Sequence, residues 1–198
     1  MKFESPLISA TLVRRYKRFL ADMILDNGEQ ITVHTPNTGS MLGCAEPGTR
    51  IWLRDSHNPA RKYRFAWEVA STPAGVQVGI NTHLANKLVQ EAIENRTIKE
   101  LQGYESIRTE VKFGEENSRI DLLLEHRVRP ACYVEVKNVT AIQHNATAIF
   151  PDAVSERGRK HLRELMHMAR QGYRAVMVYC VQRMDAECFA PADEIDPA

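Results

Sequence analysis

Apolar and polar residues alternate in short runs over the first part of the chain. In the run Phe19–Leu25 every second residue is apolar, as in a strand with one face in a core. The step Asn27-Gly28 separates it from the run Gln30–His34. Such a step between two strand-like runs is typical of a hairpin, because Asn and Gly tolerate positive φ. Three further runs have strand character: Arg50–Leu53, Tyr63–Ala70 and Val76–Ile80. About five short strands predict a small barrel, of which the OB fold is one kind.

Near residue 80 the pattern changes to one with longer, helical periods. Asn81 or Thr82 can cap a first helix, whose apolar stripe is Leu84, Leu88, Val89, Ala92 and Ile93. A second helix is expected at about residues 154–171, with Asp152 as its cap and Gly172 at its end. Three strands are predicted between the helices and one after them: Ile107–Phe113, Ser118–Glu125, Ala131–Asn138 and Arg174–Val181. The last strand is apolar enough to be buried on both faces. The predicted domains are therefore residues 1–80, an OB-like β-barrel, and residues 81–198, with αβββαβ order.

The predicted strands Ser118–Glu125 and Ala131–Asn138 gather carboxylates. In the simplest hairpin register Asp121 lies opposite Glu135, and the other face is wholly apolar: Ile120, Leu122, Leu124, Cys132, Val134 and Val136. The simplest closure of the preceding hairpin places Glu110 opposite Asp121. Three carboxylates would then stand in a row across three strands, on the face away from the core.

Opposed carboxylates on paired strands repel each other, since their Cβ atoms lie about 5 Å apart. Mg²⁺ or Mn²⁺ would relieve the repulsion, and the expected ligands are Asp121, Glu135 and Glu110. Lys137 projects from the same face as Glu135 and can stabilise charge on an attacked phosphate. Glu91, in the first helix, could reach this site or face water. The alternative for the whole set is an exposed strand face that carries charge for solubility. The spacing of Asp121 from Glu-Val-Lys on a hairpin favours the metal site.

Composition limits the classes of protein that this chain can be. A net charge of +1 means that any nucleic-acid surface must come from uneven placement of basic residues. The scattered cysteines argue against a zinc ribbon and a disulfide framework: Cys44, Cys132, Cys180 and Cys188. No run approaches membrane-spanning length, and the first residues lack a signal core. A soluble protein of the reducing cytoplasm is expected.

Basic residues gather beside aromatic residues in the first domain, and further basic residues lie along the second predicted helix. Cations neutralise phosphates and rings stack on bases, so DNA is the expected partner. The rings of Phe19, Phe65 and Trp67 are interpreted as barrel core, and His161 as a partly buried structural histidine. The loop Pro36–Met41 either holds a phosphate with its backbone donors or is simply a tight turn. The predicted DNA-binding residues are Arg14, Arg15, Arg18, Arg61, Arg64, Arg157 and Lys160.

Two segments, Ser118–Asp121 and Tyr133–Asn138, resemble the PD-(D/E)XK nuclease signature. In more detail, the chain resembles the bacterial and archaeal sugar fermentation stimulation protein family over essentially its whole length. The blocks that carry this likeness are Arg15–Asp22, Pro36–Met41, Phe150–Val154, Arg157-Gly158 and Lys160–Leu162. The resemblance implies an OB-like domain followed by a restriction-endonuclease-like domain, DNA binding without strong sequence preference, and a regulatory link to sugar use, maltose especially.

The family pattern carries over residue by residue. Asp121 matches its second-strand acid, Glu135 and Lys137 match its third-strand carboxylate and lysine, and Glu91 best matches its helical glutamate. Ile120 stands where the signature has proline. The family usually continues past residue 195 with another helix and strand, so a shortened chain is expected. The function predicted is a DNA-binding protein with a nuclease-like Mg²⁺ site. The alternatives are a non-catalytic DNA-binding regulator, and an RNA- or nucleotide-directed hydrolase.

Overall fold

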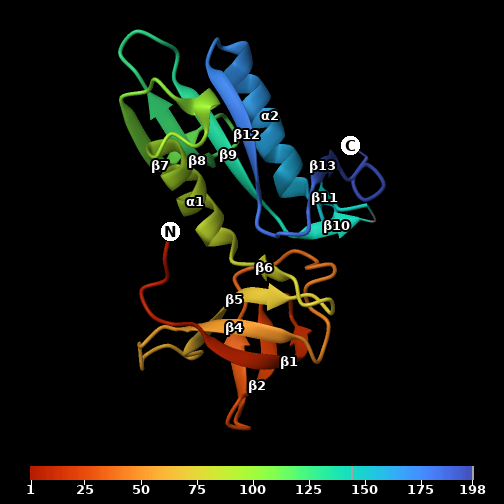
Figure 1. Ribbon diagram of the computed structural model, residues 1–198. Coiled ribbons are helices and arrows are strands. Elements are labelled where there is room, and N and C mark those ends of the chain that lie inside the picture. The colour runs from red at the N-terminus through yellow and green to blue at the C-terminus, as the bar shows by residue number, and fades with distance from the viewer. Residues whose placement is uncertain (144, 198) are drawn as a thin grey trace. The chain divides into compact units, whose positions relative to one another are not determined.

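A computed structural model describes residues 1–143 and 145–197 of the chain, shown in Figure 1. It divides into two compact units, neither of them continuous in sequence. Unit 1 contains residues 1–82, 138–154 and 181–197, and unit 2 contains residues 83–137 and 155–180. The predicted boundary at residue 80 is close to the first crossing between units. The prediction did not anticipate that two later segments return to unit 1.

Five strands of unit 1 form a closed barrel, as the OB-like prediction requires. They are β1 (Ile8–Tyr16), β2 (Leu20–Leu25), β3 (Gln30–His34), β4 (Arg50–Asp55) and β5 (Phe65–Ser71). Their order is β3-β2-β1-β4-β5, and a parallel pairing of β3 with β5 at His34 and Ala66 closes the barrel. The short strand β6 (Gln77–Gly79) pairs with β5. The hairpin at Gly28, where φ is 86°, is confirmed by the pairing of β2 with β3.

The core of the barrel corrects one aromatic prediction. Trp67 is completely buried and Phe65 packs against the core, but Phe19 is 44% exposed. Phe19 directly precedes β2, after Lys17 and Arg18, which both have positive φ. This turn directs the ring away from the core. The strand β1 was not predicted, because the basic residues at its end and a register shift between Leu12 and Arg14 interrupt its alternation.

Three more strands of unit 1 were also not predicted: β10 (Ala141–Gln143), β11 (Thr147–Phe150) and β13 (Cys188–Pro191). They form a separate sheet in the order β10-β11-β13, with β11 and β13 parallel. Each has three or four residues. Such lengths are too short to show a period.

Unit 2 follows the predicted αβββαβ order. The elements are α1 (Thr82–Glu94), a 3₁₀ turn (Lys99–Leu101), β7 (Ser106–Phe113), β8 (Ser118–Glu125), β9 (Cys132–Val139), α2 (Glu156–Arg170) and β12 (Arg174–Val181). The sheet has the order β12-β9-β8-β7 (Figure 1). Both faces of β12 pack on a core, with Val176, Val178 and Cys180 on one side and Ala175 and Met177 on the other, but this edge strand is only half-buried. Ser155, not Asp152, caps α2, since its side chain accepts a hydrogen bond from Gly158 N.

Helices cover both faces of this sheet, so the prediction of a solvent face opposite the core is also wrong. Leu122 and Leu124 pack with α1, whereas Ile120 packs with α2. Ile120 therefore does not share the face of Leu122 and Leu124. The cause lies at the intervening position: Glu110 has φ 55°, and the β7–β8 ladder omits the pair of Glu110 and Asp121. This distortion breaks the alternation of β8 at Asp121.

Candidate metal centre

Asp121 and Glu135 lie on the neighbouring strands β8 and β9. The observed pairs Leu122–Val134, Leu123–Tyr133 and Leu124–Cys132 are those of the predicted register, and the ladder ends one position before Asp121 and Glu135. Asp121 Oδ2 accepts a hydrogen bond from the backbone N–H of Val136 at 2.7 Å. Its Oδ1 accepts one from Asn86 Nδ2 at 2.8 Å. A helix and a strand therefore both orient this carboxylate at the distortion in β8.

Glu135 is buried, with 2% of its surface exposed. Lys137 Nζ lies 2.6 Å from its Oε1, and His161 Nδ1 of α2 contacts the same oxygen. Its other oxygen, Oε2, is buried and has no hydrogen-bond partner among the described residues. One carboxylate oxygen thus has two donors, while the second has none among the described residues.

The two carboxylates differ in their electrostatic environment. Burial raises the pKa of Asp121, and the negative charge of Glu135 raises it further. Burial alone would raise the pKa of Glu135 too, but the hydrogen bond from His161 and the charge of Lys137 outweigh it and lower that pKa. The negative charge of Glu135 is therefore stabilised by its neighbours, whereas the charged form of Asp121 is disfavoured.

The remaining predicted site residues lie as follows. Lys137 projects to the same face as Glu135 and is 14% exposed. Glu91 lies half-buried on α1, but the α1 residue that reaches Asp121 is Asn86. Glu110 is exposed at the distorted position. Among residues 1–143 and 145–197, no three His, Cys, Asp or Glu side chains are grouped to hold a metal ion. The predicted row of three carboxylates is therefore not formed, because the β7–β8 ladder omits the pair of Glu110 and Asp121.

Sequence reasoning missed two members of the site. His161 was interpreted as a structural histidine, and Asn86 was not considered. The only available signal for Asn86 was its position inside a helix, where asparagine is a weak former. No signal in one sequence pairs His161 with Glu135, which lies twenty-six positions earlier.

Arg15 and Arg18 hold a loop of the barrel. The Arg15 guanidinium donates to the backbone carbonyls of Arg18, Asn37, Gly39 and Ser40, at 2.6 to 3.3 Å. Arg18 Nε donates to the Thr38 carbonyl at 3.0 Å. These contacts commit both side chains to the loop Pro36–Met41.

The loop Pro36–Met41 also uses its own backbone donors. Gly39 N donates to Asn37 Oδ1 at 2.8 Å. Met41 N donates to Asp152 Oδ2 at 3.1 Å, and the Ser40 hydroxyl donates to the same oxygen at 3.0 Å. These bonds favour the tight-turn interpretation of the loop over a phosphate nest.

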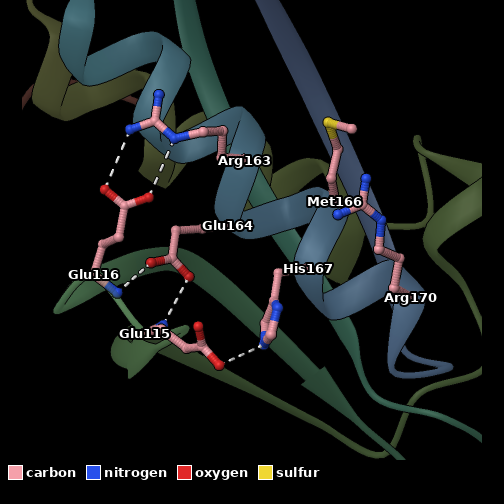
Figure 2. A pocket seen from close by; sticks show the side chains of 7 residues that line it. All are labelled: Glu115, Glu116, Arg163, Glu164, Met166, His167 and Arg170. Atoms are coloured by element: carbon pink, nitrogen blue, oxygen red, sulfur yellow. Dashed lines mark hydrogen bonds and ion pairs between the residues drawn. The ribbon is translucent and has the colours of Figure 1, made fainter.

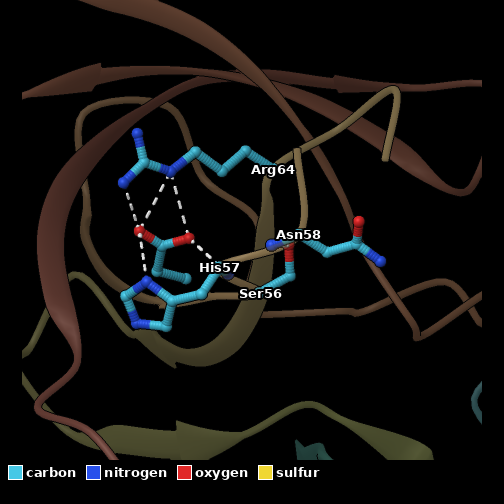
Figure 3. Close-up of polar contacts among 5 residues, drawn as sticks. Ser56, His57, Asn58 and Arg64 are labelled. Carbon is cyan, nitrogen blue, oxygen red and sulfur yellow. Dashed lines mark hydrogen bonds and ion pairs between the residues drawn. The ribbon is translucent and has the colours of Figure 1, made fainter. Parts of the chain in front are cut away.

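The other predicted DNA-binding cations lie nearer to solvent. Arg64 forms an ion pair with Asp55, as close as 2.5 Å, beside His57 and Ser56 in the β4–β5 loop (Figure 3). This pair lowers the pKa of Asp55 to about 2. Arg14 pairs with Asp22 at 2.8 Å. Arg61 and Arg157 are exposed, and Lys160 Nζ donates to the Glu116 carbonyl.

Helix α2 also forms hydrogen bonds and an ion pair with the turn between β7 and β8 (Figure 2). The buried Glu164 carboxylate accepts the backbone N–H groups of Glu115 and Glu116, at 3.0 and 2.5 Å. Arg163 pairs with the Glu116 carboxylate at 3.2 Å. A cavity of about 360 Å³ borders this contact and also involves Met166, His167 and Arg170. The helix that supplies His161 is thereby fixed to the hairpin that carries Asp121.

Comparison with known proteins gives consistent matches over the whole chain. Residues 13–80 match the model of the SfsA N-terminal OB domain, and residues 83–198 match that of the Sugar fermentation stimulation protein RE domain. A Sugar fermentation stimulation protein homolog of Thioalkalivibrio sulfidiphilus is 56% identical, covering 100% of this chain and 82% of its own. The homolog of Geobacter metallireducens is 57% identical, covering 100% of this chain and 84% of its own.

A solved structure, that of Pyrococcus furiosus SfsA in complex with Ca²⁺, also matches the fold. The TM-score is 0.85 at 28% sequence identity. The match covers 100% of this chain and 81% of that one. Within the described residues, no helix has the length and apolar character needed to cross a membrane.

Proposed function

Because the chain belongs to the sugar fermentation stimulation protein family, we propose that it binds DNA with little sequence preference and can hydrolyse phosphodiester bonds. The centre comprises Asp121, Glu135 and Lys137, with Mg²⁺ or Mn²⁺ as cofactor. The proposed biological role is in the regulation of sugar metabolism, of maltose especially. The observation that carries the proposal is the pair of carboxylates, Asp121 half-buried and Glu135 buried, in which Oε2 of Glu135 has no hydrogen-bond partner among the described residues.

The donor set fits a hard divalent cation. Mg²⁺ binds to proteins through one or two carboxylates and keeps several waters, so Asp121 and Glu135 suffice without Glu110. A buried carboxylate oxygen without a hydrogen bond is costly, and a cation would satisfy it. The pKa of Asp121 is raised in part by the charge of Glu135, and a cation between them would offset that repulsion. The complex of Pyrococcus furiosus SfsA with Ca²⁺ adds support from a relative.

The chemistry proposed for the centre is hydrolysis of a phosphodiester. A bound divalent cation would supply an activated water and neutralise charge on the phosphate. Asp121 and Glu135 would hold the cation, with Asp121 fixed by Asn86 and the Val136 backbone. Lys137 is 14% exposed, so its ammonium can contact a phosphate oxygen as negative charge develops there. Glu91 of α1 is proposed as a further catalytic residue of this centre.

Each unit would contribute its own phosphate contacts. In unit 1 these are the exposed cations Arg14, Arg61 and Arg64. In unit 2 they are Arg157 and Lys160, three residues apart on α2. Arg15 and Arg18 were also predicted to bind DNA, but their hydrogen bonds to the loop Pro36–Met41 support a structural role instead. Contacts to phosphate alone explain binding with little sequence preference.

A second candidate is a DNA-binding regulator that retains the fold without cleaving DNA. The observation that favours it is that Lys137 and His161 already contact the Glu135 carboxylate and compensate its charge. A third alternative, an RNA- or nucleotide-directed hydrolase, shares the same centre and differs only in substrate.

Single-turnover cleavage of single- and double-stranded DNA, with Mg²⁺, Mn²⁺ or EDTA, tests the proposal. Lys137→Ala should retain most DNA and metal affinity and lose about 100-fold or more in cleavage rate. Lys112→Ala, which removes an exposed lysine of β7, is the matched control and should cleave normally. If the unmodified protein binds DNA but cleaves neither substrate with either metal, the regulator is the correct assignment. An RNA substrate in the same assay tests the third alternative.

A further inference from the structure

We infer that His161 is a positioning residue: its Nδ1–H fixes Oε1 of Glu135 and so leaves Oε2 as the oxygen that binds the cation. The inference rests on the proposed metal centre, but it concerns a residue of α2 outside the Asp-Glu-Lys set.

The geometry separates the two oxygens of Glu135. Both of its hydrogen-bond donors, Lys137 Nζ and His161 Nδ1, lie on Oε1. Oε2 is buried and has no hydrogen-bond partner among the described residues. Because the partner of the imidazole is a carboxylate, the proton must lie on Nδ1 for the contact to be a hydrogen bond. Two donors on one oxygen select one orientation of the carboxylate.

His161 restrains this orientation more than Lys137 can. Lysine carries its ammonium on a flexible four-carbon stem, which loses rotational freedom when it is fixed. The imidazole has only two side-chain torsions, and its side chain is 10% exposed. A rigid donor from a second element therefore limits the side-chain rotation of Glu135 in a way that Lys137, from the same strand, does not.

Helix α2 is itself held in place. Leu165 and Met168 pack into the core against β8, and Ser155 caps the first turn. Glu164 binds the backbone of the β7–β8 turn. The position of the imidazole is therefore set by the packing of the helix rather than by Glu135.

Partners that orient metal ligands are expected to have a measurable effect on affinity. Removal of such a hydrogen bond typically lowers metal affinity about 10- to 100-fold. If His161 serves only to fill space in the interface of α2 with the sheet, its loss would lower stability and leave metal affinity intact. Thermal stability and metal affinity together therefore distinguish the two roles.

The test is calorimetric titration of the full chain with Mn²⁺ alone, at one fixed pH, with thermal melts in EDTA. His161→Ala should bind Mn²⁺ about 10- to 100-fold more weakly than the unmodified protein. His161→Asn places an amide N–H where Nδ1 was, and should restore the affinity to within about three-fold. His161→Gln places its amide farther out, near the position of Nε2, and should remain weak. His167→Ala removes another histidine of α2, which contacts Glu115, and should not change the affinity.

Glu135→Gln separates failure of this inference from failure of the proposed function. If the unmodified protein does not bind Mn²⁺, the metal centre is absent and both are overturned. If Glu135→Gln loses Mn²⁺ while His161→Ala or His161→Gln binds it normally, the inference alone is overturned. Equal weakening by His161→Asn and His161→Gln also overturns it, since position of the donor would then not matter. Should the alanine variant fail to fold, the comparison of Asn with Gln decides the question.

Discussion

Neutralising the two carboxylates of the centre should change the stability of the metal-free protein in opposite directions. Asp121→Asn removes a carboxyl group whose pKa is raised by burial and by the charge of Glu135. The folded state therefore disfavours the charged form of Asp121. Its hydrogen bonds can be kept: the new amide can still accept from Val136 N, and Asn86 can turn its amide to accept from the new donor. Relief of repulsion between opposed like charges is worth about 0.2–1 kcal/mol.

Glu135→Gln should be destabilising, although it also removes a buried charge. The pKa of Glu135 is lowered by His161 and Lys137, so the folded state favours the charged form. Both donors lie on one oxygen and would lose a charged acceptor, at about 1.5–3 kcal/mol for such a bond. In a chain of this size about 1 kcal/mol shifts Tm by 2–4 °C. The melting temperature should therefore rise by up to about 4 °C for Asp121→Asn and fall by about 3–12 °C for Glu135→Gln.

Thermal melts in EDTA and in Mn²⁺ measure both effects. Mn²⁺ at one hundred times its Kd should stabilise the unmodified protein by about 2.7 kcal/mol, and neither variant should show this gain. An increase in Tm for Glu135→Gln in EDTA would show that Lys137 and His161 do not compensate its charge. A full Mn²⁺ shift in both variants would refute the site.

Three further predictions concern other contacts. NMR titration should give Asp55 a pKa of about 2, and Arg64→Ala should raise that pKa towards 3.8. The stability that the ion pair of Asp55 and Arg64 contributes is present above pH 3.8 and is lost as the pH falls towards 2. Arg61→Ala and Arg157→Ala should each flatten the salt dependence of DNA binding by about one unit. Arg15→Ala should leave that slope unchanged. It should instead lower the stability by at least about 1.5 kcal/mol, since it leaves four carbonyls without their donor. Equal salt slopes for the Arg15, Arg61 and Arg157 variants would contradict the structural role of Arg15. Gly114→Ala should cost more in chemical denaturation than Gly28→Ala: both sites have positive φ, at about 1–2 kcal/mol, but only at Gly114 would the new Cβ collide with the Glu164 carboxylate. Equal losses would show that Glu164 moves away freely.

The sequence by itself determined the elements that have a clear period and the pairing that follows from them. The β8–β9 register is that predicted, because it puts the apolar residues Leu122, Leu124, Cys132 and Val134 on one face. The αβββαβ order of unit 2 was also predicted, from the periods of its separate elements. The same register predicted Asp121 near Glu135 and Lys137, although the observed ladder ends at Leu122 and Val134. The hairpin at Gly28 was predicted from turn chemistry together with the strand-like runs on either side of the turn.

The tertiary structure decided the features that the alternation of apolar and polar residues along a strand does not predict. The positive φ of Glu110 and its missing pair with Asp121 remove Glu110 from the expected row of carboxylates. The contact of His161 with Glu135 requires α2 to lie against the sheet, and the contact of Asn86 with Asp121 requires α1 on the other side. Arg15 resembled a phosphate ligand by its charge, but the fold places four backbone carbonyls around it. For His161, for Asn86 and for three of the four carbonyls around Arg15, the partner is distant in sequence, and only packing brings the two groups together.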